Sequence, residues 1–225
     1  MFYLSHRAIV RALVTAHERG AGLRVLLDPN RDAFGRKKDG VPNRQVALEL
    51  HRAGIPVRWC NTDGEQCHGK MLVVEHADGT GTLLAGSANF TRRNLDNLNL
   101  ETNVQVRRGT MPVLADAAAF FDARWNNEPG RVYSLAYEAF ADSSPLRYWR
   151  YRFMEWSGWS SFPACRDRRV MPPHRAVLTI LQDLTFSAHI RTPAVQVWCV
   201  ALLMTFSKLR ASSQMHPWMA VARYW

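Results

Sequence analysis

His68 and Lys70 stand two residues apart at the start of an apolar run that ends at Glu75. Side chains two residues apart share a face of an extended strand, so His68, Lys70 and Leu72 are predicted to point the same way. An imidazole can act as a nucleophile or general acid near neutral pH. A nearby ammonium group neutralises the non-bridging oxygens of a phosphodiester as charge develops. The pair therefore predicts chemistry on phosphate.

Polar residues on the next two segments complete a candidate site. Gly86-Ser87-Ala88-Asn89 follows the next apolar run, and Glu101 is expected on a third strand. Glycine permits close backbone approach, while the Ser87 hydroxyl and Asn89 amide can donate hydrogen bonds to phosphate oxygens. Glu101 can accept a hydrogen bond from a histidine and thereby hold its tautomer. Ser87 and Asn89 are therefore candidate phosphate ligands.

The elements that must position these residues alternate between strand and helix. Strands are predicted at 23–27, 55–59, 70–75, 82–85 and 101–106, with a hairpin-like connection at 76–81. Helices are predicted from Ser5 as N-cap to Gly20 as stop, at 44–53 and at 111–125. This rhythm predicts an α/β fold with a mixed or parallel β-sheet flanked by helices.

Composition narrows the class of partner. The net charge of +10 favours phosphate-bearing partners such as nucleic acid or anionic lipid. Residues 1–162 carry only 21 Lys and Arg against 17 Asp and Glu, which argues against strong nucleic-acid binding. The longest apolar run, 193–206, is shorter than the ~20 residues that span a bilayer. No signal-peptide pattern is visible, and the compartment stays open.

The four cysteines do not predict a metal site. Cys60, Cys67, Cys165 and Cys199 form no CxxC pair, so neither zinc nor another cofactor is expected. Cys60 and Cys67 could form a disulfide, although nothing in the sequence requires it. Cys67 adjoins His68 and is interpreted as a small residue in a strand rather than as a thiol nucleophile.

The combined pattern of His-x-Lys-x4-acid, Gly-Ser-x-Asn and Asn-x-Glu resembles the signature of the phospholipase D superfamily. The surrounding sequence, roughly residues 2–162, resembles a bacterial, cardiolipin synthase-like branch, through segments 24–30, 43–46, 64–66 and 91–95. The resemblance implies that two such motifs meet at one site. One histidine then forms a phosphohistidine, the other protonates the leaving alcohol, and no metal is required.

The resemblance also implies a role for each residue. His68 is the nucleophile or its acid/base partner, Lys70 and Asn89 bind phosphate, and Ser87 assists them. Glu101 orients a histidine. Glu75 stands where the superfamily usually has Asp, and it is interpreted as a structural acid.

Only one such motif is present, because no other histidine has a lysine two residues later. The resemblance implies either a homodimer that supplies the second motif or the C-terminal half of a two-motif enzyme. The second interpretation is preferred, since Phe2-Tyr3-Leu4-Ser5 resembles the opening of such a half. Residues 1–162 are then a catalytic half-domain. Residues 163–225, with 8 basic and 2 acidic side chains, are a poorly defined basic extension, interpreted as unselected, with weak helices at 177–184 and 195–209.

Three functions compete. The first is a phosphodiesterase or phosphatidyltransferase of the phospholipase D type, acting on a phospholipid or another phosphodiester. The second is a homodimeric, metal-independent nuclease, and the third is an inactive fragment that binds phosphate. The segment 111–162 is longer than a minimal nuclease needs, which favours the first. The Trp, Tyr and Arg residues within 147–159 are interpreted as packing, with a membrane surface as the alternative.

Overall fold

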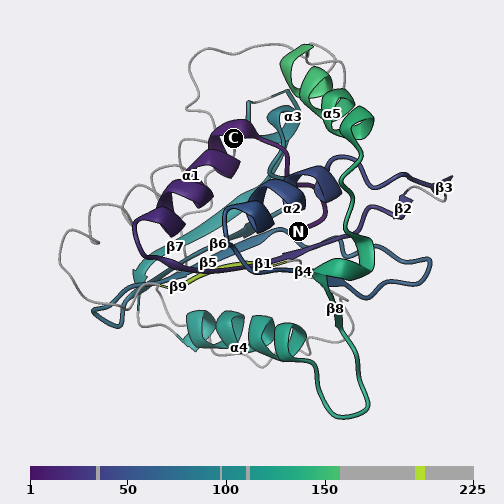
Figure 1. Ribbon diagram of the computed structural model, residues 1–225. Coiled ribbons are helices and arrows are strands. Elements are labelled where there is room, and N and C mark those ends of the chain that lie inside the picture. The colour runs from purple at the N-terminus through teal and green to yellow at the C-terminus, as the bar shows by residue number, and fades with distance from the viewer. Residues whose placement is uncertain (34–35, 97, 110–111, 158–195, 201–225) are drawn as a thin grey trace.

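A computed structural model describes residues 1–33, 36–96, 98–109, 112–157 and 196–200. Within them, seven strands form one mixed sheet in the order β7-β6-β5-β9-β1-β4-β8 (Figure 1). The strands of this sheet are β1 Gly22–Leu27, β4 Val57–Cys60, β5 Met71–Glu75, β6 Gly81–Gly86, β7 Asn103–Gly109, β8 Ser134–Ala136 and β9 Gln196–Val200. Two short strands, β2 Asp32–Ala33 and β3 Arg36–Lys37, form a separate antiparallel ribbon. The predicted α/β class is confirmed.

Helices cover both faces of the large sheet. The helices are α1 Arg7–Glu18, α2 Asn43–Arg52, α3 Arg92–Leu95, α4 Pro112–Asn126 and α5 Pro145–Ser157, with a 3-10 turn η1 at Tyr137–Phe140. Helices α1 and α2 lie on one face and α4 lies on the other (Figure 1). In the described part of the chain, no helix combines the length and apolar character needed to cross a membrane.

The ends of α1 show one correct and one incorrect prediction. Gly20 follows the helix with φ of 95°, a left-handed conformation that suits glycine after a helix C-terminus. Ser5 is not the N-cap, because the helix begins after His6 and no side chain caps it. Instead, the N–H groups of Ser5 and His6 donate to the carbonyl of Phe90, which ties this end to the segment after β6.

Strand direction divides the sheet into two parts. Strand β1 runs parallel to β4, with α2 in the connection between them, as parallel neighbours require. Strands β5, β6 and β7 are antiparallel, and the predicted hairpin at 76–81 is confirmed. Leu72 and Val74 pack into the core under α1 and α2, whereas Met71 and Val73 pack with Phe121 of α4. Strand β5, which begins directly after Lys70, is thus packed against helices on both faces of the sheet.

Strand β9 joins these two parts. It pairs in parallel with β1, where Leu23 faces Val197, and antiparallel with β5, where Val73 faces Trp198. The helix predicted over 195–209 is therefore wrong at residues 196–200. The facing edges of β1 and β5 each carry backbone donors and acceptors that only an extended segment can satisfy. The remainder of 163–225, including the helix predicted at 177–184, lies outside the described residues.

Candidate active site

His68 and Lys70 lie immediately before β5, in the segment that links it to β4, and not within a strand as predicted. Their side chains nevertheless meet. Lys70 Nζ lies 2.8 Å from His68 Nδ1 and donates a hydrogen bond to the His68 carbonyl at 2.6 Å. The Lys70 side chain is buried, whereas His68 is exposed. The arrangement presents an accessible imidazole above a buried cation.

Burial changes the protonation of both groups. It lowers the pKa of Lys70 to about 8, because charging a desolvated ammonium is costly, and the Glu101 carboxylate opposes this shift. The pKa of His68 is also lowered, first by partial desolvation of its ring and then by the Lys70 charge, again opposed by Glu101. The Phe2 ring contributes apolar surroundings, with its centroid 4.7 Å from the His68 ring and 5.5 Å from Lys70 Nζ. A neutral imidazole beside a cation is therefore the form favoured near neutral pH.

Three donors hold Glu101. Its Oε2 accepts a 2.5 Å hydrogen bond from Ser87 Oγ, and its Oε1 accepts from the amides of Asn94 and Asn99, the latter at 2.8 Å. The residue precedes β7 by two positions, so its predicted place on a strand is wrong. Among the described residues, no hydrogen bond joins Glu101 to His68, and its role in orienting a histidine stays a prediction.

Gly86 brings the end of β6 against the segment before β7. A Cβ atom at this position would collide with the Thr102 carbonyl and with Asn103. The close approach allows Ser87 N–H to donate to the Thr102 carbonyl, and Thr102 N–H to donate to Ser87 Oγ, both at 2.9 Å. The absence of a side chain at Gly86 therefore lets Ser87 reach Glu101.

Asn89 faces the N-terminal segment and a neighbouring cavity. Its Oδ1 accepts a hydrogen bond from Tyr3 N–H at 3.2 Å, which orients the amide group. The cavity has a volume of about 630 Å³, and its lining includes Tyr3, Asn89, Arg93, Asn94, Asn99 and Glu155. His68 and Lys70 do not line it. Phosphate binding by Asn89 and Ser87 stays a prediction.

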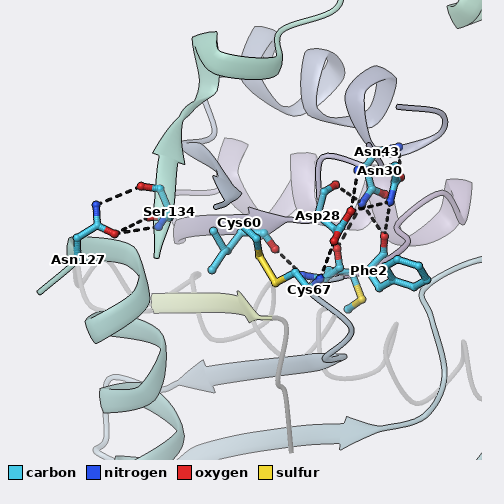
Figure 2. Close-up of a disulfide and its surroundings, with 10 residues drawn as sticks. Phe2, Asp28, Asn30, Asn43, Cys60, Cys67, Asn127 and Ser134 are labelled. Atoms are coloured by element: carbon cyan, nitrogen blue, oxygen red, sulfur yellow. Dashed lines mark hydrogen bonds between the residues drawn. A yellow bond between two sulfur atoms is a disulfide. The ribbon is translucent and has the colours of Figure 1, made fainter. Parts of the chain in front are cut away.

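A disulfide holds the segment that carries His68. The sequence allowed this disulfide but did not require it. Cys60, at the end of β4, is bonded to Cys67, with Cα atoms 6.2 Å apart (Figure 2). Cys67 is therefore neither a free thiol nor a strand residue. A spacing of seven residues between two cysteines was the only available signal, and it does not require pairing.

A buried polar cluster that sequence reasoning missed lies beside this disulfide (Figure 2). The Asp28 carboxylate accepts hydrogen bonds from the N–H groups of Cys67 and Asn30, each at 2.7 Å. Asn43 donates to the carbonyls of Phe2 and Asp28 at 2.8 and 2.9 Å. These contacts connect the end of β1, the start of α2 and the N-terminal segment to the residue before His68. In the sequence, Asp28 was assigned to a turn and Asn43 to the end of a polar loop.

Glu75 lies apart from this group. It occupies the far end of β5, roughly 16 Å from Lys70 at about 3.3 Å per residue. Its side chain is exposed, and its charge acts on the pKa of Arg24. Glu75 is therefore outside the candidate site, and its structural role stays a prediction. Among the described residues, no group of three or more His, Cys, Asp or Glu side chains could hold a metal ion.

The fold and this set of side chains define a class. An α/β fold that carries a His-x-Lys pair followed by Gly-Ser-x-Asn and Asn-x-Glu fits the motif of the phospholipase D superfamily. A model of the protein family described as cardiolipin synthase, PLD-like domain, matches residues 1–125, and the chain belongs to this family. The match contains every candidate site residue and confirms the resemblance. The comparisons with curated proteins and with solved structures produced no match.

Proposed function

We propose that this chain provides one half of a phospholipase D-type active site that hydrolyses or transfers phosphatidyl groups. Membership of the family supports phosphodiester chemistry in general. The lipid substrate and the roles of individual residues are the further steps of this proposal. The second His-x-Lys motif comes from another copy of the chain or from another polypeptide segment.

The observation that carries the proposal is the 2.8 Å contact between Lys70 Nζ and His68 Nδ1. In the proposed reaction, a ring nitrogen of neutral His68 attacks phosphorus and forms an N–P bond as the P–O bond to the alcohol breaks. The histidine of the second motif gives its proton to the leaving alcohol. Water or a second alcohol, deprotonated by that same histidine, then attacks phosphorus and releases His68. His68 and its counterpart can exchange these roles.

The surrounding residues supply electrostatic support. Lys70 neutralises the non-bridging oxygens. This electrostatic interaction is stronger in a buried setting than in water, because the local dielectric constant is lower. Asn89 donates to the same oxygens. Ser87 and Glu101 form a hydrogen-bonded unit whose negative charge keeps Lys70 more protonated than burial alone would.

Two assays on the full chain separate the candidate functions. In the first, fluorescent phosphatidylcholine is incubated with ethanol, and formation of phosphatidylethanol supports the proposal. In the second, single-stranded DNA is incubated in EDTA, and cleavage by a species that sediments as a dimer identifies the nuclease instead. Silence in both assays rules out an active homodimer of this chain and leaves two candidates: an inactive phosphate-binding protein, or a site that another polypeptide segment completes.

Point variants test the site itself. His68→Ala should abolish turnover, because no other histidine in the chain has the motif spacing. His76→Ala, in the β5–β6 connection at the other end of β5, is the matched control and should retain activity. Turnover that survives in His68→Ala would overturn the assignment.

A further inference from the structure

One face of α5 carries four large apolar side chains that are exposed. Leu146, Trp149, Phe153 and Trp156 are 80%, 70%, 50% and 79% exposed. At 3.6 residues per turn, these positions fall within an arc of about 80°. They form a continuous outward stripe, named here the α5 stripe. Exposed apolar surface of this kind, bordered by polar residues, marks a site of interaction.

The helix beneath the stripe is firmly attached. Tyr151, on the opposite side of α5, is 1% exposed, and its hydroxyl accepts a 2.9 Å hydrogen bond from Arg7. Arg92 donates to the Glu155 carbonyl near the C-terminal end of the helix at 3.2 Å. The inward and outward faces of α5 are thus defined by packing.

Positive charge borders the stripe. Arg152 and Arg150 fall on either side of it on the helix surface; Arg150 forms an ion pair with Asp39, and Arg147, one turn before, forms one with Asp142. The single acid of the helix, Glu155, lies on the inward side, where partial burial raises its pKa. Lys38 and Arg93, together with the acids Asp39 and Glu155, line the cavity that α5 borders through Arg150 and Met154. The outward surface of this region is therefore apolar in the middle, with Arg152 on one margin and the Arg150–Asp39 ion pair on the other.

We propose that the α5 stripe docks onto an anionic lipid surface. Tryptophan flanked by arginine is favoured at the boundary between head groups and acyl chains, and arginines pair with lipid phosphates. A second protein is a poorer fit. Four such side chains can bury on the order of 500 Å² of accessible surface area. Each partner in a stable protein interface buries ~800 Å².

Docking in this way has a consequence for the proposed reaction. The cavity lined by Asn89 shares α5 with the stripe, so a docked helix brings that cavity to the level of the lipid head groups. The docking proposal goes beyond the proposed reaction. It can be tested independently of that reaction, because vesicle binding is measured without turnover.

The test is co-sedimentation of the full chain with vesicles. Mixed phosphatidylglycerol and phosphatidylcholine vesicles are compared with phosphatidylcholine vesicles, with and without added salt. The chain should bind the anionic vesicles, and a Trp149→Ser/Phe153→Ser/Trp156→Ser variant should bind at least tenfold more weakly. Arg152→Gln should weaken binding about fivefold, as expected for one basic residue near an anionic surface.

Controls separate docking from folding and from catalysis. Val132→Ser changes a side chain that is 56% exposed in the loop before β8 and should leave vesicle binding unchanged. Thermal melting should show that every variant folds, because all the changed side chains lie at the surface. Hydrolysis of a water-soluble phosphodiester reports the proposed chemistry separately. Equal vesicle binding by the triple variant, no binding by the wild type, or a self-association that the triple variant abolishes would each overturn the proposal.

Discussion

The buried carboxylate of Asp28 accepts a 2.7 Å hydrogen bond from the backbone N–H of Cys67, one residue before His68. Asp28 follows β1 directly, so this contact joins the end of the central parallel strand to the segment that carries the motif. Because the same carboxylate also accepts from Asn30 N–H, it positions two pieces of chain at once.

Replacing Asp28 should therefore affect both stability and activity. In Asp28→Asn, one oxygen becomes an NH₂ group that faces a backbone N–H, which leaves a buried donor unsatisfied. We expect a loss of about 1–3 kcal/mol in the free energy of unfolding and a fall in kcat of about 10–100-fold as His68 shifts. Urea unfolding and initial rates measure the two effects. Asp116→Asn, at an exposed position on α4, is the control; equal effects from both variants would contradict the prediction.

The lowered pKa of Lys70 predicts an alkaline limit to activity. Lys70 is charged below about 8 and loses its proton above it, so kcat/KM should fall as pH rises through that value. The unfolded chain keeps this proton up to about 10.4, so stability from this group should rise with pH between the two values. Lys70→Arg should show no such fall in kcat/KM, since arginine stays charged. An unchanged alkaline limit in that variant would assign it to another group.

Removing the charge of Glu101 should move the pH profile. Glu101 raises the pKa of both Lys70 and His68, so Glu101→Gln should shift both limbs of the kcat/KM profile to lower pH. A purely structural role would lower the rate without moving the limbs. Glu75→Gln, at the other end of β5, serves as the matched variant and should leave the profile in place. A profile that does not move in Glu101→Gln contradicts the proposed electrostatic role.

The Cys60–Cys67 disulfide should stabilise the fold. Closing a loop of this size contributes about 2–3 kcal/mol by restricting the unfolded chain. The Cys60→Ser/Cys67→Ser variant should lose about that amount in urea unfolding. Dithiothreitol should destabilise the wild type similarly and leave the double variant unaffected. If the wild type is insensitive to the reductant, the disulfide contributes nothing measurable.

Deleting residues 163–225 tests whether the pairing of β9 with β1 and β5 stabilises the fold. The deletion exposes the facing edges of β1 and β5, and each lost backbone hydrogen bond costs about 0.5–1.5 kcal/mol. We expect a fall of several kcal/mol in the free energy of unfolding, measured by urea denaturation. An unchanged stability would instead support the interpretation of this segment as an unselected extension.

Much of the fold follows from local patterns. The runs that became β1, β4, β5 and β6 are short, apolar and separated by turn residues, and α1, α2 and α4 were each predicted within a few residues. These elements are visible because burial on a strand or helix requires a fixed spacing of apolar side chains. The prediction failed at β9, since a strand that fills a gap between two others is selected by their edges, which lie far away in sequence.

The motif is also visible in the sequence alone. His68, Lys70, Ser87, Asn89 and Glu101 are recognisable by type and spacing, because together they resemble the phospholipase D motif, and their catalytic roles stay predictions. Only the tertiary structure decided how Lys70 is buried, which donors hold Glu101, and that Asp28 and a disulfide fix the segment before His68. It also turned Trp149 and Trp156 outward, where packing had been predicted. The burial of a side chain and its hydrogen-bond partners depend on residues that are distant in the chain. A shifted pKa or an exposed apolar stripe therefore arises only when the folded chain brings those residues together.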